Sequence, residues 1–536
     1  MCAMASRLQK PFWSGIALGW GLAVAPGLVP AGDEGPILYY ENLGDYSRAV
    51  TTDSESAQAW FDQGLRLAYG FARQAAADAF LQATRHDPDC ALCHWGAAWV
   101  LGPYQNNPGG VGERAEAAAA AQAALRALSR AEAVAPWEQA LVEAMAQRYP
   151  DGSDQAAATA PYAEAMERAA VAHPDDPDVQ TLYAEALMMF RPWDLHDEEE
   201  GPYPETQAAV QALEGVLADH PQHPGACHLY IHAVEAWEPQ RAEACADRLA
   251  DAIPGVSHIQ HMPSHIYMHV GRFGDAVHQN QQARIMDQAA ARGAGVSVYP
   301  THNTAMLAFA AWMDGQSGVA LSAARDLARE SPGDAFHYDL LLARFGRWDQ
   351  LADRDDRPEM PFQAGMWHFA QGLAALRSRG PEAASGDLQA LRRIRDNTPE
   401  EATYQFFGHP KQDLLGIAEE ILAAEVALAE GRDVDAEAAL REAVRLEDGL
   451  PYSEPEPWPI PARHVLGAVL LEIGDAEEAE SVYREALSVH PDNGWALRGL
   501  QQSLAAQGKA AEARQVAEAF EQAWQRADIW LPGSRF

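Results

Sequence analysis

The feature that most constrains the fold is a pattern of small, aromatic and proline residues with a period of about 34 residues. It is clearest from residue 57 onwards, in Trp60, Gly64, Leu67, Ala76, Phe80, Ala83 and Pro88. Small residues let two helices approach closely, an aromatic ring fills the space between them, and proline ends the second helix. The pattern returns as Gly467, Leu470, Ala479, Tyr483, Ala486 and Pro491. We therefore predict helical hairpins.

This pattern is typical of tetratricopeptide repeats, whose antiparallel helix pairs stack into a superhelical solenoid. No stretch alternates as a β-strand does, so we predict an all-α fold. A solenoid also accommodates 536 residues, because it lengthens without enlarging one core. The predicted segments are a signal peptide (1–31), an extended lead-in (32–56), a repeat solenoid with the candidate site (57–335), helical hairpins (336–450), a Pro-rich connector (451–461) and C-terminal repeats (462–536).

The N-terminus has the pattern of a cleavable export signal. Arg7 and Lys10 precede an apolar run, and Ala31 ends a stretch suited to cleavage. A signal anchor is the competing interpretation, which the proline and glycine residues of the run disfavour. We expect a periplasmic or otherwise exported protein, with no stable membrane insertion after cleavage.

The acidic composition limits the partners. The chain has 77 Asp and Glu against 39 Lys and Arg, a formal net charge of −38. Nucleic-acid binding needs a basic surface, so we do not expect it. The concave groove of a repeat solenoid could instead bind a protein partner.

Two His-x-x-x-His pairs are the candidate metal ligands. Consecutive repeats carry His228 and His232 in one predicted helix and His261 and His265 in the next. Residues four apart share a helix face, and neighbouring helices pack about 8–10 Å apart, so the four imidazoles can face one another. Imidazole is a common transition-metal ligand. The alternative is that these are polar residues lining a wet groove. Further candidates for the site are Glu235, His258 and His302.

The identity of the metal is less constrained. Imidazole sites suit copper, zinc, iron or nickel. An exported location, with Met262 and Met268 beside the histidines, favours copper. Glu235 and Tyr267 are the catalytic candidates, although the repeat position of Tyr267 predicts core packing equally well.

Cys90, Cys93 and His94 form a Cys-x-x-Cys-His motif with three interpretations. In exported proteins it is typical of c-type haem attachment, with the histidine as axial ligand. The two thiols could instead form a disulfide, or bind a metal. Cys227 and Cys245 are predicted in the two helices of one hairpin, where they could form a second disulfide, or Cys227 could be a metal ligand.

The segment from His258 to Arg272 (HIQHMPSHIYMHVGR) resembles a family of exported bacterial tetratricopeptide proteins of largely uncharacterised function. The shared motifs are H-M-P-S-H-I-Y, H-x-x-x-H-A-V-E and a Cys-x-x-Cys followed by Trp-Gly, within residues 57–335. The resemblance implies a family-wide feature formed by His228, His232, His261, His265, Cys90 and Cys93. The chain departs from the family pattern at Ala72-Arg73, where Asn-His is frequent, and at His94, where an aromatic residue is more frequent. The resemblance implies no particular activity.

Three functional hypotheses follow from these patterns. The first is a periplasmic repeat protein that holds a copper centre on its concave wall, for metal binding or as a metal-dependent oxidoreductase acting on a small molecule. The second is a non-enzymatic interaction scaffold. The third is a haem c electron carrier.

Overall fold

The computed structural model describes residues 37–150, 155–197, 201–405 and 408–536. Its helices all lie in one unit, Tyr39–Phe536; of the other unit, Met1–Leu38, only residues 37 and 38 are described. The first helices are α1 (Glu55–Tyr69), α2 (Arg73–His86), α3 (Ala91–Leu101), α4 (Arg114–Arg130), α5 (Pro136–Arg148), α6 (Gln155–Ala172), α7 (Pro177–Met188) and α8 (Pro204–Asp219). Then come α9 (Pro224–Val234), the 3-10 helix η1 (Pro239–Ala242), α10 (Glu243–Ala252), α11 (Ser257–His261), α12 (Pro263–His269), α13 (Phe273–Ala290), α14 (Pro300–Met313) and α15 (Ser317–Glu330). The remainder are η2 (Pro332–Asp334), α16 (Phe336–Arg344), α17 (Trp348–Ala352), α18 (Pro361–Arg379), α19 (Pro381–Asp396), α20 (Lys411–Ala429), α21 (Asp433–Asp448), α22 (Ala462–Ile473), α23 (Ala476–Val489), α24 (Gly494–Ala506) and α25 (Ala510–Ala523).

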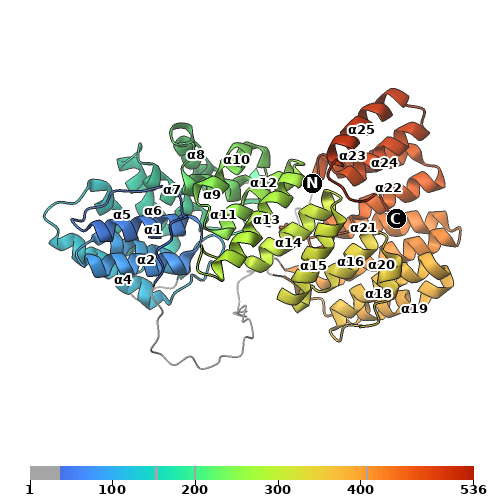
Figure 1. Cartoon of the computed structure of the whole chain (residues 1–536), viewed down its shortest axis with the longest axis horizontal. Helices are drawn as coiled ribbons and strands as arrows, with labels where there is room; N and C mark the ends of the chain where they lie inside the picture. The colour runs from blue at the N-terminus through green and yellow to red at the C-terminus, as the bar shows by residue number, and fades with distance from the viewer. Residues whose placement is uncertain (1–36, 151–154, 198–200, 406–407) are drawn as a thin grey trace, which may run out of the picture. The chain divides into compact units, whose positions relative to one another are not determined.

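The first hairpin shows how the repeat residues pack. Helices α1 and α2 lie side by side (Figure 1), and Phe80 on α2 is fully buried. A Cβ added to Gly64 on α1 would lie 2.8 Å from the Phe80 ring, and one on Gly96 of α3 would lie 2.5 Å from it. The two glycines therefore let three helices close around one aromatic ring, as the repeat pattern predicts.

The same arrangement recurs near the C-terminus. Tyr483 on α23 is buried, and added Cβ atoms on Gly467 of α22 and Gly499 of α24 would lie 2.5 and 2.0 Å from its ring. Successive helices pack on one another along the chain. The fold is almost entirely helical and of the tetratricopeptide type, which confirms the predicted fold class.

The histidine-bearing segment differs from its prediction in one respect. The sequence predicts one helix containing both His261 and His265, but the structure divides it into α11 and α12 at Met262. Pro263 lacks a backbone N–H, so it begins a new helix instead of continuing the old one. Met262 keeps α-helical dihedral angles (φ −51°, ψ −37°), so the direction is maintained and the two histidines still share a face.

The signal peptide and the Pro-rich connector are the remaining predicted segments. The predicted signal peptide lies outside the described residues. No helix lies between α21 and α22, where the Pro-rich connector is predicted, and the Glu454–Pro455 peptide bond there is cis. Two-residue strands pair as β1 (His196–Asp197) with β2 (Gly201–Pro202) and as β3 (Thr403–Tyr404) with β4 (His409–Pro410). Among the described residues, every helix is too short or too polar to span a bilayer.

Candidate metal centre

Six histidines from four helices gather in two groups of three. His228 and His232 on α9 join His258 on α11, and His261 on α11 joins His265 on α12 and His302 on α14. Within each group the ligand atoms all lie within 4.8 Å of one another. We call these groups triad A (His228, His232, His258) and triad B (His261, His265, His302). The four predicted ligands are brought together, but they are divided between two sets.

In triad A, hydrogen bonds set the orientation of the imidazoles. His228 Nδ1 lies 2.6 Å from the Tyr69 carbonyl oxygen, which can only accept, so Nδ1 carries the proton. Its Nε2 therefore has a free lone pair and faces His258 Nε2 at 3.2 Å. His232 Nε2 and His258 Nδ1 are buried and have no hydrogen-bond partner among the described residues. A metal ion bound between the three rings would satisfy His232 Nε2.

Triad B is oriented in the same way. His261 Nδ1 lies 2.7 Å from Asn280 Oδ1, and the amide nitrogen of Asn280 donates to the Ala276 carbonyl, which fixes the amide orientation. His261 Nε2 is left facing His265 Nε2 at 2.7 Å. The ring of His302 lies 4.7 Å from that of His261 and 5.7 Å from that of His265, measured between centroids.

Two buried carboxylates, Glu235 and Glu454, form ion pairs with histidines of the cluster and its border. Glu235 contacts His232 Nδ1 and His265 Nδ1, each at 3.1 Å, and so connects the two triads. Glu454, from the connector before α22, pairs with His265 and with His269 Nε2, the latter at 2.7 Å. Within the described chain, the ion-pair partners of both carboxylates are histidines and never Lys or Arg. The carboxylates therefore create a negative potential that favours a cation at the imidazoles.

The pKa values follow from this arrangement. Burial lowers the pKa of His228, His258 and His261 well below the usual range, and lowers that of His302 to about 3. These imidazoles are neutral at pH 7, the form that binds metals. Burial would also lower the pKa of His265, but Glu454 and Glu235 raise it to about 10. An ion bound at His265 Nε2 would replace the proton held there.

Strained aromatic residues border the histidines. Phe71 packs on all of triad A, with its ring centroid 4.2 Å from that of His228. Trp193 and Tyr299 contact His232 and His258 edge-on. These three aromatics have positive φ (56°, 67° and 54°), and they are three of the five non-glycine residues with positive φ in the described part of the chain. Each such conformation costs about 1–3 kcal/mol, and such strain concentrates at functional sites.

Tyr267, one of the catalytic candidates, is held elsewhere. Its hydroxyl donates to Asp247 at 2.9 Å, and its ring lies under the Arg272 guanidinium at 4.1 Å. These contacts support the packing interpretation of Tyr267. Glu235, the other candidate, lies against the histidines.

The structure shows both cysteine pairs as disulfides. Cys90 and Cys93 are joined with an S–S distance of 2.07 Å, and Cys227 and Cys245 with 2.17 Å. His94 beside the first pair interacts through Nε2 with the Pro88 carbonyl at 3.0 Å. This is the disulfide alternative among the three interpretations of the motif. Haem attachment at Cys90, Cys93 and His94 stays a prediction, which a pyridine haemochrome spectrum tests.

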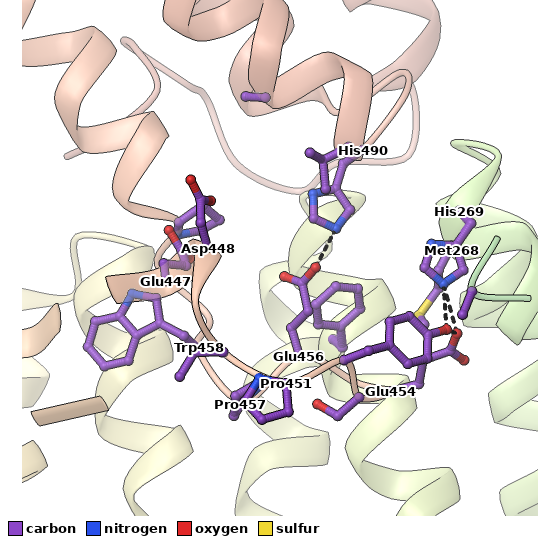
Figure 2. A pocket seen from close by; sticks show the side chains of 18 of the residues that line it. Met268, His269, Glu447, Asp448, Pro451, Glu454, Glu456, Pro457, Trp458 and His490 are labelled. Carbon is purple, nitrogen blue, oxygen red and sulfur yellow. Dashed lines mark hydrogen bonds and ion pairs between the residues drawn. The ribbon is translucent and has the colours of Figure 1, made fainter. Parts of the chain in front are cut away.

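A cavity of about 400 Å³ adjoins the centre. Figure 2 shows Met268 and His269 on one side, and Glu454 paired with His269, while Glu456 pairs with His490. Its other lining residues include Trp237, Phe309, Tyr452 and Trp458. Because Glu454 contacts both the cavity and His265, a small molecule in the cavity would lie one carboxylate away from triad B.

Asn280 is a positioning residue for His261, which gives a testable prediction. Asn280→Leu removes the acceptor for His261 Nδ1, so the ring can adopt the other tautomer or rotate. We expect the affinity for copper, measured by competition with a chelator, to fall about 10- to 100-fold. Asn280→Asp keeps an oxygen acceptor and should retain most of the affinity; equal losses in both variants would contradict the positioning role.

Glu447, which lines this cavity, should make the stability of the protein depend on pH. Burial raises the pKa of Glu447 to about 8 against an ordinary value of 4.5, although the Ala462 N–H donates to its carboxylate at 2.8 Å. Neighbouring Glu456 and Asp448 raise it further, and Arg463 opposes them. Folded protein therefore holds a proton that unfolded protein has lost, so stability is full at low pH and falls as pH rises from 4.5 to about 8.

Glu447→Gln should remove this contribution. Between pH 5 and pH 8.5 we expect the melting temperature of the wild type to fall more steeply than that of the variant. This range covers about 3.5 pH units, and titration of one group changes the free energy of unfolding by at most roughly 1.4 kcal/mol per unit. Parallel curves would show that Glu447 is ionised in the folded protein at both pH values.

Sequence reasoning missed several residues of the centre. Glu454 follows His269 by 185 residues, so no local spacing connects them. Phe71 belongs to an earlier repeat, Asn280 lies on α13, the helix that follows α12, and any repeat core accepts both side chains. The one available signal for Glu454 was its place in a connector rich in proline and aromatic residues, because such loops between packed helices are often functional.

Comparison with known proteins adds little to this geometry. No protein-family model matches the chain, and no curated protein matches it. Among solved structures, the tetratricopeptide domain of P58(IPK) matches with 13% identity over 85% of this chain and 99% of that one, at a TM-score of 0.23. Human IFIT1, as a dimer with PPP-AAAA, matches with 12% identity over 89% and 92%, at 0.30. Yeast Tom70 matches with 11% identity over 87% and 92%, at 0.29. These likenesses carry no conclusion about the site.

Proposed function

We propose that this protein is an exported tetratricopeptide-type protein that binds a transition metal, copper in the first instance, at its buried histidine cluster. The observation that carries the proposal is the orientation of the four predicted ligands. The Nδ1 atom of each faces a carbonyl, amide or carboxylate oxygen, which directs Nε2 inward. This is how metal-binding histidines are held in proteins.

The residues fit such an ion on chemical grounds. The imidazoles of His228, His258, His261 and His302 are neutral at pH 7, and His232 Nε2 is buried without a partner in the described structure. Glu235 and Glu454 supply compensating negative charge. Imidazole ligands and the affinity order of divalent ions favour copper.

The chemistry would take place between this cluster and the adjoining cavity. Bound copper would supply one-electron redox chemistry. The protein's own residues have separate tasks: Glu454 and His269 border the cavity and can orient a polar substrate, while Phe71 excludes water from triad A. We propose an oxidoreductase acting on a small molecule that enters this cavity.

Metal analysis of a matched pair of proteins tests the proposal. The full chain is expressed with its N-terminal segment in copper-replete medium, next to His261→Ala/His265→Ala and to His278→Ala, which changes an exposed histidine on α13. The wild type and His278→Ala should retain copper after dialysis, and the double variant should lose at least half of it. Equal copper in all three would reject the site.

A second candidate function is an interaction scaffold, which the repeat fold itself favours, because such repeats commonly present a binding surface to a protein. Recovery of a stoichiometric partner by metal-free protein, with equal yield from the His261→Ala/His265→Ala variant, would favour it over the metal centre.

A further inference from the structure

We infer that the cluster holds two metal ions, one in each triad, as a single binuclear site. The inference deepens the proposed function and rests on it. Its starting point is how the candidate ligand atoms group in the described chain. The six histidines form two sets of three, a third set joins His265 to Glu235 and Glu454, and no set combines the four predicted ligands.

Triad A has the donors for an ion of its own. His228 Nε2 and His258 Nε2 are 3.2 Å apart, close to the spacing of about 3.3 Å that two nitrogens keep in a tetrahedral site with metal–nitrogen bonds of 2.0–2.1 Å. His232 Nε2, fully enclosed beside them, has no partner among the described residues. An ion between these three rings would satisfy that nitrogen, and small movements of the rings would complete the coordination.

Triad B presents an equivalent set of donors. The proton on His261 is fixed at Nδ1 by Asn280, and His265 Nδ1 faces the two carboxylates, so both Nε2 atoms are directed at the same place. His302 supplies the third ring from α14. Because His261 and His265 come from consecutive short helices, their backbones are held in place by the packing of α11 and α12 on α13.

The two triads are neighbours rather than separate sites. The rings of His258 and His261 are 5.7 Å apart between centroids, and those of His232 and His265 are 5.9 Å apart. Glu235 contacts the Nδ1 atoms of His232 and His265, so one carboxylate orients a ligand in each triad. Its negative charge offsets part of the repulsion between two cations held so close together.

Ion stoichiometry tests this inference with variants that separate the triads. The full chain is loaded with copper(II) and measured by native mass spectrometry and elemental analysis, together with His258→Ala, His302→Ala, both combined, and the His278→Ala control. We expect two ions in the wild type and the control, one in each single variant, and none tightly bound in the double variant. Far-UV circular dichroism and melting curves show whether each variant is folded.

The outcomes separate this inference from the proposed function. One ion in the wild type, lost in both single variants, would overturn the binuclear inference but leave the metal centre intact. No bound ion in the wild type would overturn both. Two ions that persist in the double variant would place the metal elsewhere and also overturn both. The wild-type count does not depend on whether a variant folds.

Discussion

Glu454→Ala is expected to destabilise the protein by about 3–5 kcal/mol and to weaken copper binding. Glu454 is buried and pairs with His265 and His269, and the Tyr452 hydroxyl donates to it. Truncation removes one of the two carboxylates that face the buried His265, and also the carboxylate paired with His269. Buried charge that loses this compensation is costly. The shift is measured as the change in denaturant midpoint and melting temperature.

Glu456→Ala is the matched control for this variant. Glu456 lies two residues further along the same connector and pairs with His490 at 2.9 Å, but its side chain is 37% exposed. Solvent screens this partly exposed carboxylate, and screened ion pairs contribute about 0–1 kcal/mol, so this variant should unfold closer to the wild type than Glu454→Ala. If Glu454→Ala also unfolds with the wild type, Glu454 does not anchor the histidines.

Loading the metal-free protein with copper is expected to raise its free energy of unfolding. A ligand that binds only the folded chain adds about 4 kcal/mol when its free concentration is a thousand times its dissociation constant. The melting temperature should therefore rise with copper concentration and return after chelation. We expect this rise because the proposed ligands come from α9, α11, α12 and α14, which are far apart in an unfolded chain.

His261→Ala/His265→Ala provides the corresponding negative control. It removes two ligands of triad B and leaves the exposed histidines of the chain unchanged. We expect its melting temperature to rise less than half as much as that of the wild type at the same copper concentration. An equal rise in both proteins would mean that copper binds elsewhere.

The sequence predicts the helical framework well because the repeat residues act locally. Phe80 is enclosed by Gly64 and Gly96 within two successive repeats, so the period alone shows where the helices meet. The pairing of His228 with His232 and of His261 with His265 is equally local, since it depends on helix periodicity. Each of these pairs stays within one group of ligands in the structure.

The rest of the site depends on tertiary contacts that no local spacing encodes. Packing decides which rings lie together: His258, one turn before His261, turns towards His228 instead, and His302 completes the other triad. Glu454 reaches His265 through a connector without helix, so its position follows from the packing of distant repeats. Asn280 lies on the second helix of a repeat, and its sequence position does not distinguish it from other polar residues there. Only the structure shows that its amide faces His261.

An X-ray crystal structure of copper-loaded protein, with anomalous differences recorded at the copper absorption edge, would locate any bound ions. We expect strong peaks inside the cluster, within about 2.0–2.1 Å of histidine nitrogens. One should be bounded by His228, His232 and His258, and the other by His261, His265 and His302. Copper-loaded crystals with no anomalous peak among these six rings would contradict the proposed metal centre.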